Sequence, residues 1–154
     1  MALSSGSAAL RHTLRDEAMP GQLVATLIDS TEALQPPPHA ETVGAAVATC
    51  IAIADGMLDG RNVTSVLRDL SVAAAQWARA GTPLDVVLRG VHEGVRLVVG
   101  LTFAHAPSGD RETLIDGFRV AMTIADRLCT TVAQSYAAVP CDASTSSPDS
   151  TRRG

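Results

Sequence analysis

The sequence contains no lysine, so every basic side chain apart from histidine is an arginine. Without lysine the chain has no amine for Schiff-base chemistry and no ammonium group to hold a nucleotide phosphate. Aromatic residues are also scarce, at 3% of the chain, although hydrophobic residues as a whole reach 46%. The core must therefore be built from Ala, Val, Leu and Ile, which favours closely packed helices.

Motifs for catalysis and for metal binding are missing as well. The sequence has no HExxH or ExxH pair, no CxxC, no GxSxG, no P-loop and no GxGxxG. Its three cysteines, Cys50, Cys129 and Cys141, are odd in number and are typical of free thiols in a reducing compartment. We therefore expect no enzyme activity, no metal and no cofactor.

Charge and hydropathy bear on partners and location. A net charge of -4 argues against general binding to phosphate backbones, so no direct DNA binding is expected. No signal peptide is visible at the N-terminus, and the longest apolar runs, Gly44 to Ala54 and Leu97 to Ala104, are shorter than the roughly 20 residues of a membrane span. The expected location is the cytoplasm, away from membranes.

Proline and glycine divide the chain into helix-length segments, and no Val, Ile or Thr run alternates as a strand would. The predicted fold is all-α, a globin-like or antiparallel bundle of about six helices with a long C-terminal helix. The predicted domain covers residues 8–139, between a disordered N-terminus (1–7) and a disordered tail (140–154). The predicted helices span residues 8–18, 21–34, 40–58, 63–80, 83–105 and 110–139.

The fifth predicted helix is amphipathic. Its apolar residues repeat every three or four positions from Leu84 to Val98, and its charged residues share the opposite face. Within that face His92, Glu93 and Arg96 form a candidate ligand or interaction site. The alternative is a solvated helix face whose charge pairs contribute only tenths of a kcal/mol.

Two other functions are compatible with the helix pattern. The segment from Val63 through Gly81 to Arg96 has helix-turn-helix spacing, although its second helix is neutral and has no amide side chain to read bases. A chain of 154 residues in about six helices is also globin-sized, and His92 or His105 could ligate a haem iron. Few aromatic residues are present to line a porphyrin pocket.

The last predicted helix carries two apolar heptad series. The first is Ile115, Met122, Cys129 and Tyr136, and the second is Phe118, Ala125, Val132 and Val139. At about 1.5 Å per residue this helix spans roughly 45 Å, more than a compact domain of this size needs. We therefore predict a homodimer whose seam is formed by Cys129, Val132, Tyr136 and Val139 near the C-terminal end.

The segment from Trp77 to Leu88, WARAGTPLDVVL, followed by His92-Glu93-Gly94-Val95-Arg96, resembles the N-terminal sensory domain of actinobacterial PucR/CdaR-type transcription regulators. That domain is related to the RsbRD N-terminal domain. The closing helix, with Leu128 to Tyr136 reading LCTTVAQSY, is similar to the family's last helix. The resemblance covers roughly residues 20–139.

The resemblance implies an all-α fold of the kind found in non-haem globin sensor domains of stress signalling. It implies a non-catalytic signal-input or protein-interaction domain that dimerises and acts through a regulatory protein partner. In the family this domain precedes a DNA-binding helix-turn-helix, which we expect to be missing from this chain because it ends about fifteen residues after the last predicted helix. The alternative is a globin-like protein that binds haem or another small ligand.

Overall fold

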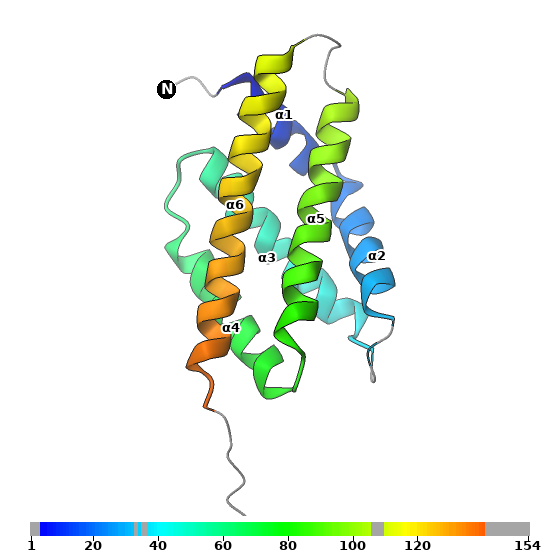
Figure 1. Cartoon of the computed structure of the whole chain (residues 1–154), viewed down its shortest axis with the longest axis vertical. Coiled ribbons are helices and arrows are strands. Elements are labelled where there is room, and N and C mark those ends of the chain that lie inside the picture. Colours follow the sequence, from blue (N-terminus) through cyan, green and yellow to red (C-terminus); the bar gives the residue numbers. More distant parts are fainter. Residues whose placement is uncertain (1–3, 33, 35–36, 106–109, 141–154) are drawn as a thin grey trace, which may run out of the picture.

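The computed structural model describes residues 4–32, 34, 37–105 and 110–140. Over these residues the chain forms six helices and no strand, which confirms the all-α prediction (Figure 1). The last four helices begin and end within one residue of their predicted bounds. The helices are α1 (Ser5–Leu14), α2 (Met19–Thr31), α3 (Ala40–Leu58), α4 (Thr64–Arg79), α5 (Leu84–His105) and α6 (Arg111–Ala138).

Helix α1 begins earlier than predicted, inside the segment expected to be disordered. Ser4 caps it, since the Ser4 hydroxyl accepts a hydrogen bond from the backbone N–H of Ser7 at 3.3 Å. Ser5, Gly6 and Ser7 are therefore helical, and this part of the prediction was wrong because small polar residues were taken as a sign of disorder. Residues 1–3 and most of the predicted tail, 141–154, lie outside the described residues.

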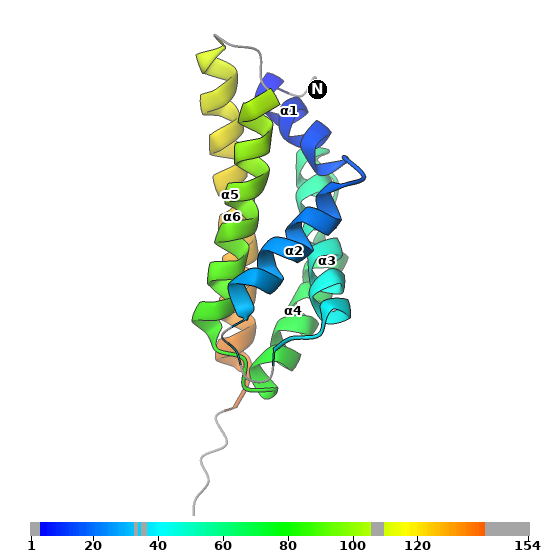
Figure 2. The ribbon, with the colours of Figure 1, turned by 90° about the vertical axis from the view of Figure 1, so that its right-hand side faces the viewer.

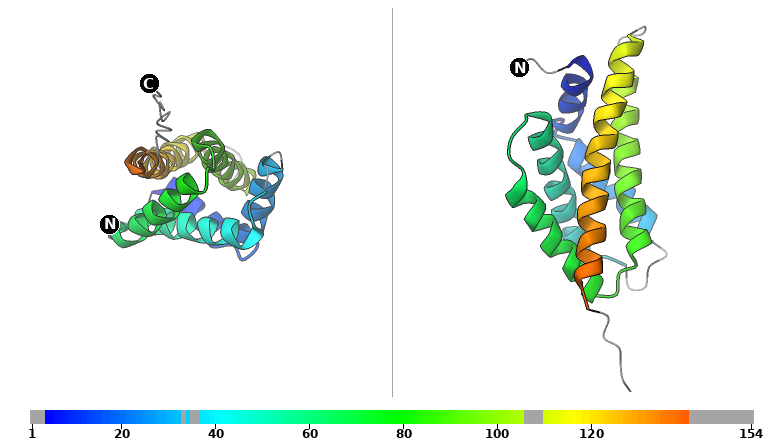
Figure 3. Two further views of the ribbon diagram at one scale, coloured as in Figure 1. Left: turned by 90° about the horizontal axis from the view of Figure 1, so that it is seen from below. Right: turned by 60° about the vertical axis from the view of Figure 1, so that its left-hand side comes forward.

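Five of the helices form a closed ring. Contacts run from α6 to α5, from α5 to α2, from α2 to α3, from α3 to α4, and from α4 back to α6. Seen along the long axis, the helices surround a common centre (Figure 3). Helix α1 contacts α3, α5 and α6 and lies across one end of this ring, as Figure 2 also shows. The ring is therefore covered at the end where α1 lies.

Helix α1 is held on the ring partly by a glycine contact with α6. A Cβ atom on Gly6 would overlap the backbone of Gly117, so the two helices approach as closely as their backbones allow. On the same helix Thr13 is linked to α5, because the hydroxyl oxygens of Thr13 and Thr102 lie 2.8 Å apart in a buried position. Only a residue without a side chain fits at Gly6.

An ion-pair cluster fixes the other end of α1 to α3. Arg15 donates to Asp55 through Nε (2.9 Å) and to Asp59 through Nη2 (3.1 Å). Arg61 donates to Asp55 at 2.8 Å, and Arg11 pairs with Asp59. The hydrogen bond from Arg15, together with the nearby guanidinium charges, lowers the pKa of Asp55 below its ordinary value. The cluster therefore stays ionised at neutral pH and ties α1 to the end of α3.

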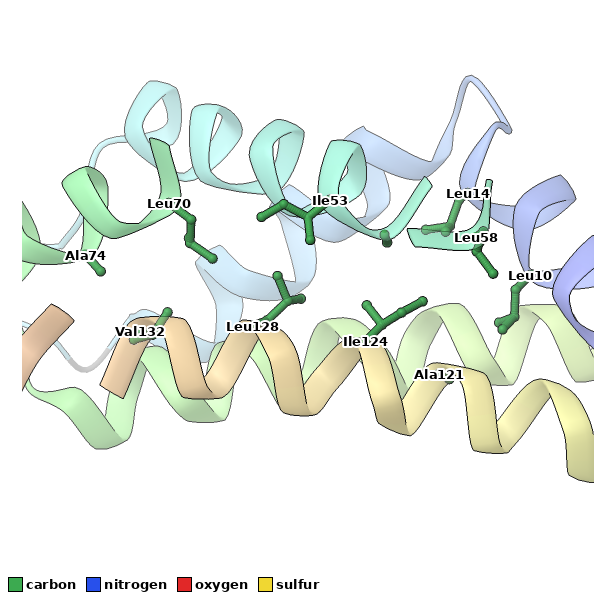
Figure 4. Close-up of a cluster of buried hydrophobic side chains, with 11 residues drawn as sticks. Leu10, Leu14, Ile53, Leu58, Leu70, Ala74, Ala121, Ile124, Leu128 and Val132 are labelled. Atoms are coloured by element: carbon green, nitrogen blue, oxygen red, sulfur yellow. The ribbon is translucent and has the colours of Figure 1, made fainter. Parts of the chain in front are cut away.

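The buried core lies between α6 and the α3–α4 pair. Ile124, Leu128 and Val132 from α6 point toward Ile53 of α3 and Leu70 of α4 (Figure 4). Other buried members of this cluster are Leu10, Leu14, Ala54, Leu58, Ala74 and Ala121. A second, smaller group consists of Met19, Leu23 and Val47. The core is aliphatic, as the composition predicts.

Helix α3 is the most apolar helix of the bundle. Its length and its mean hydropathy of 1.4 are sufficient for a membrane-spanning helix. The sequence did not indicate this, because its uninterrupted apolar runs are shorter. In the structure α3 packs between α2 and α4, and its Ile53 side chain is fully buried. Only 28% of its apolar window is buried inside the structure, so packing in the ring accounts for part of its hydropathy.

We predict that Gly6→Ala lowers the free energy of unfolding by about 1–3 kcal/mol, because the added methyl group must push α1 away from α6. Gly100→Ala is the matched control. No atom lies within 4 Å of a Cβ at Gly100, which is in the interior of α5, so this change should stabilise the protein by about 1 kcal/mol. Chemical denaturation of both variants tests the contact, and equal stabilisation of the two would contradict it.

Candidate functional site: an apolar cavity inside the helix ring

The ring surrounds a cavity of about 480 Å³ that is partly open to solvent. Leu10 and Leu14 of α1 line it at one end, while His39, Gly81 and Thr82 line it at the other. Between these ends the wall is formed by Val, Leu, Ile and Ala side chains from α2, α3, α5 and α6. Its volume lies in the range of ligand-binding pockets, and its wall is predominantly apolar, as such pockets usually are.

The cavity exists because the side chains that face it are small. On α5 the inner face predicted from the sequence does point inward, and Val87, Val91 and Val95 pack against the core. Each of them nevertheless stays only half-buried, and Thr102 is the one fully buried residue described on that helix. Valine side chains on a ring of this width do not reach the opposite wall, so their inner surfaces remain accessible.

Contacts between α5 and α2 prevent these two helices from moving inward to fill the cavity. A Cβ on Gly90 of α5 would lie 3.2 Å from Leu27 of α2, and one on Gly94 would lie 3.5 Å from Leu23. The backbone of α5 and the side chains of α2 are therefore already in contact at these two glycines. Further approach of α2 to α5 would require these leucines to move.

Most of the cavity wall offers no polar group. Water fills a cavity well only where polar groups can bind it, and the wall is predominantly apolar. The wall therefore suits an apolar occupant better than water.

Polar groups are concentrated at the end of the cavity away from α1. Thr31, His39, Thr42 and Thr82 line it there, together with the exposed residues Pro37, Gly81 and Pro83. The α4–α5 turn and the end of α2 lie at this same end of the molecule (Figure 2). This end is the mouth of the cavity. None of the residues described along the cavity wall is an Arg, Asp or Glu.

One ionisable thiol forms part of the wall. Burial raises the pKa of Cys50 to about 12, and the nearby Cys129 adds to the shift. Such a thiol stays protonated at neutral pH and is a poor nucleophile. Cys50 is therefore an apolar wall residue at this position. Cys141 lies outside the described residues.

The candidate site of His92, Glu93 and Arg96 lies outside the cavity. His92 is exposed, and its Nδ1 lies 2.7 Å from the carbonyl oxygen of Leu88 on the same helix. Arg96 pairs with Glu93 at 3.4 Å, with its side chain 78% exposed. The three residues make local contacts along α5, which correspond to the solvated helix face considered as the alternative.

The histidines considered for haem are also outside the cavity. His105, like His92, is exposed and has its Nδ1 2.7 Å from a carbonyl of its own helix, that of Leu101. Neither residue lines the cavity; His39, at the mouth, does. In the part of the chain that the structure describes, no group of three or more His, Cys, Asp or Glu side chains is placed to hold a metal ion.

The residues predicted for the dimer seam are engaged within the chain. Val132 is 0% exposed in the core, so assigning it to a seam was wrong: α4 already covers it. The Tyr136 hydroxyl donates to the carbonyl of Thr82 at 3.0 Å, which ties the end of α6 to the α4–α5 turn. Val139 lines a second hollow, beside Tyr136, and Cys129 is half-buried.

The uncovered apolar residues of α6 lie at its other end. Ile115 and Phe118 are each 51% exposed and Met122 is 43% exposed. They belong to the two predicted heptad series, and their spacing of three and four residues places them on one side of the helix. We call these three residues the α6 patch. A large exposed apolar group of this kind commonly marks an interaction surface.

The cavity itself was not predicted from the sequence. The pattern of α5 identifies an inner face but does not show how far that face lies from the opposite wall. The available signal was the combination of Gly90 and Gly94 with a valine-rich inner face and very few aromatic side chains. That combination leaves too little side-chain volume for the centre of a ring.

The fold and the cavity define an all-helical domain with an apolar cavity inside its helix ring. A family model matches residues 17–139, which is most of the chain and agrees with the span of the resemblance noted above. The model is that of the RsbT co-antagonist protein rsbRD N-terminal domain, and the chain belongs to this family. It is accordingly a domain of the regulatory type used in stress signalling. Searches of curated proteins and of solved structures gave no match.

Proposed function

We propose that this chain is a non-catalytic signal-input domain of a bacterial stress or transcription regulatory system, located in the cytoplasm and acting on a regulatory protein partner. Membership of the RsbRD N-terminal family over residues 17–139 is the observation that carries the proposal. The cavity supports it, because an input domain needs a place where a signal can bind.

A relation to the N-terminal domains of PucR/CdaR-type regulators, and through them to non-haem globin sensors, is part of the same proposal. It rests on the Trp77 to Leu88 segment, which forms the end of α4, the turn and the start of α5. This segment also provides the mouth of the cavity at Gly81 and Thr82. The residues that carry the resemblance therefore lie where a ligand would enter.

Action through a protein rather than through DNA is favoured by the charges of α5, the helix that would read DNA in a helix-turn-helix. Arg89 lies 3.8 Å from Asp85, and Arg96 lies 3.4 Å from Glu93. Each arginine is thus paired with a carboxylate that a DNA phosphate would have to displace. A haem role is less favoured, because His92 and His105 lie outside the cavity.

The functional unit in this proposal is a homodimer formed through the α6 patch, not through the C-terminal end of α6. Two copies of α6 packed antiparallel about a twofold axis at Asp116 bring Ile115 of one copy beside Phe118 of the other. The same axis brings Glu112 beside Arg119 in two symmetric pairs, each pair within about one residue of direct opposition. Both charged residues are exposed and flank the patch, so the surface is complementary to a second copy of itself.

We predict that Arg119→Glu weakens this dimer at least tenfold, because it places like charges opposite each other twice. The double variant Glu112→Arg with Arg119→Glu restores the pairs and should recover most of the affinity. Arg127→Glu, an equivalent change on another side of α6, is the control and should leave the dimer intact. Sedimentation equilibrium measures all four proteins. A wild type that stays monomeric at high micromolar concentration would rule out the dimer.

The regulatory role is tested in the native host. Deletion of the coding region is expected to change transcription induced by stress, measured across the transcriptome before and after stress. Complementation with the wild type should restore the response, and complementation with Arg119→Glu should not. Unaltered stress-induced transcription in the deletion strain would count against the proposed function.

A further inference from the structure

We infer that the central cavity is a binding site for an elongated aliphatic molecule with a single uncharged polar end. The aliphatic part of this ligand enters between His39 and Thr82 and runs along the inner face of α5 toward Leu10 and Leu14. Calling this molecule a signal rests on the proposed function. The binding site itself rests only on the shape and chemistry of the cavity.

The shape of the cavity favours an elongated ligand. Its wall on α5 runs from Val86 to Val99, a length of roughly 20 Å at about 1.5 Å per residue. A cavity of about 480 Å³ that extends over this length matches the long axis of an extended hydrocarbon chain.

The chemistry of the wall favours hydrocarbon along the length and one polar group at the mouth. Leu, Val, Ile and Ala from five ring helices surround the middle of the cavity, together with Cys50, which is protonated at neutral pH. At the mouth, Thr42 and Thr82 supply hydroxyl groups and His39 supplies an imidazole. No described wall residue is an arginine that would pair with a carboxylate, so an alcohol suits this end better than an acid.

The α1 end sets the length of the ligand. Leu10 is 1% exposed and Leu14 is 8% exposed, and both side chains line the cavity from α1. The glycine contact of Gly6 with Gly117 and the ion pairs of Arg15 with Asp55 and Asp59 hold this helix in place. A ligand whose hydrocarbon chain is longer than the cavity therefore cannot be accommodated fully.

The test is a titration of the full-length protein with unbranched primary alcohols from octanol to octadecanol. Trp77 is the single tryptophan and lines the cavity, so its fluorescence reports occupancy. We expect saturable binding at one site, with affinity rising about threefold to fourfold per methylene group. The rise should stop once the chain exceeds the length of the cavity. At equal length the alcohol should bind more tightly than the carboxylate at pH 8.

Val91→Phe narrows the middle of the cavity and is expected to reduce decanol affinity at least tenfold. Val72→Phe is the matched control, because Val72 is 54% exposed on α4 and is not part of the cavity wall. It should leave decanol affinity unchanged. Circular dichroism checks that both variants are folded. If Val91→Phe does not fold, Ala46→Leu in the α3 wall replaces it, with the same loss expected.

A Trp77 fluorescence change that does not saturate would overturn the inference. An affinity that does not depend on the length of the alcohol would also overturn it, as would a loss of decanol affinity in Val72→Phe equal to that in Val91→Phe. Tighter binding of the carboxylate would overturn the assignment of an uncharged polar end. These outcomes are independent of the transcription experiment. If the protein binds decanol but its deletion leaves stress-induced transcription unaffected, the binding site is supported and the proposed function is contradicted. If the deletion alters stress-induced transcription but decanol does not bind, the proposed function is supported and the binding site is contradicted.

Discussion

The contacts of α6 with α4 on one side and with α5 on the other close the helix ring, and the cavity exists only because the ring is closed. Val132 and Leu70, at 0% and 1% exposure, are buried between α6 and α4. Five helices surround the axis, and the side chains that face it are almost all aliphatic. Because these side chains are short, they seal the contacts between neighbouring helices without filling the centre.

Helix α6 has different surroundings along its length. Its C-terminal half is covered by α4 and by the α4–α5 turn, to which Tyr136 is hydrogen-bonded. Its N-terminal half meets α1 at Gly117 and leaves Ile115 and Phe118 exposed on another side. If the proposed ligand and the proposed dimer both form, the inner face of α6 contacts the ligand while its outer face contacts a second copy. A ligand that shifts this helix would alter the dimer directly, since both sites share one rigid element.

The sequence predicted the helices well because periodicity and breakers act locally. The bounds of α3 agree with the prediction at both ends, and the apolar face of α5 points inward as expected. The prediction that Val132 lies in a dimer seam failed because the heptad series on α6 is continuous, whereas the helices that cover it are not. Val132 and Phe118 belong to the same series, yet one is buried and the other exposed. Which of the two is covered depends on α4, and the cavity likewise depends on distances between helices that no local pattern encodes.

The most direct test is whether the interior of the ring is hollow and apolar. Xenon enters apolar cavities without needing a polar partner, so methyl NMR spectra under xenon pressure report such a space. A hollow, apolar interior predicts saturable shifts for methyl groups of cavity residues such as Val91, Val95 and Leu128, and none for the exposed Val72. Shifts absent from the cavity residues, or equally large at Val72, would contradict it.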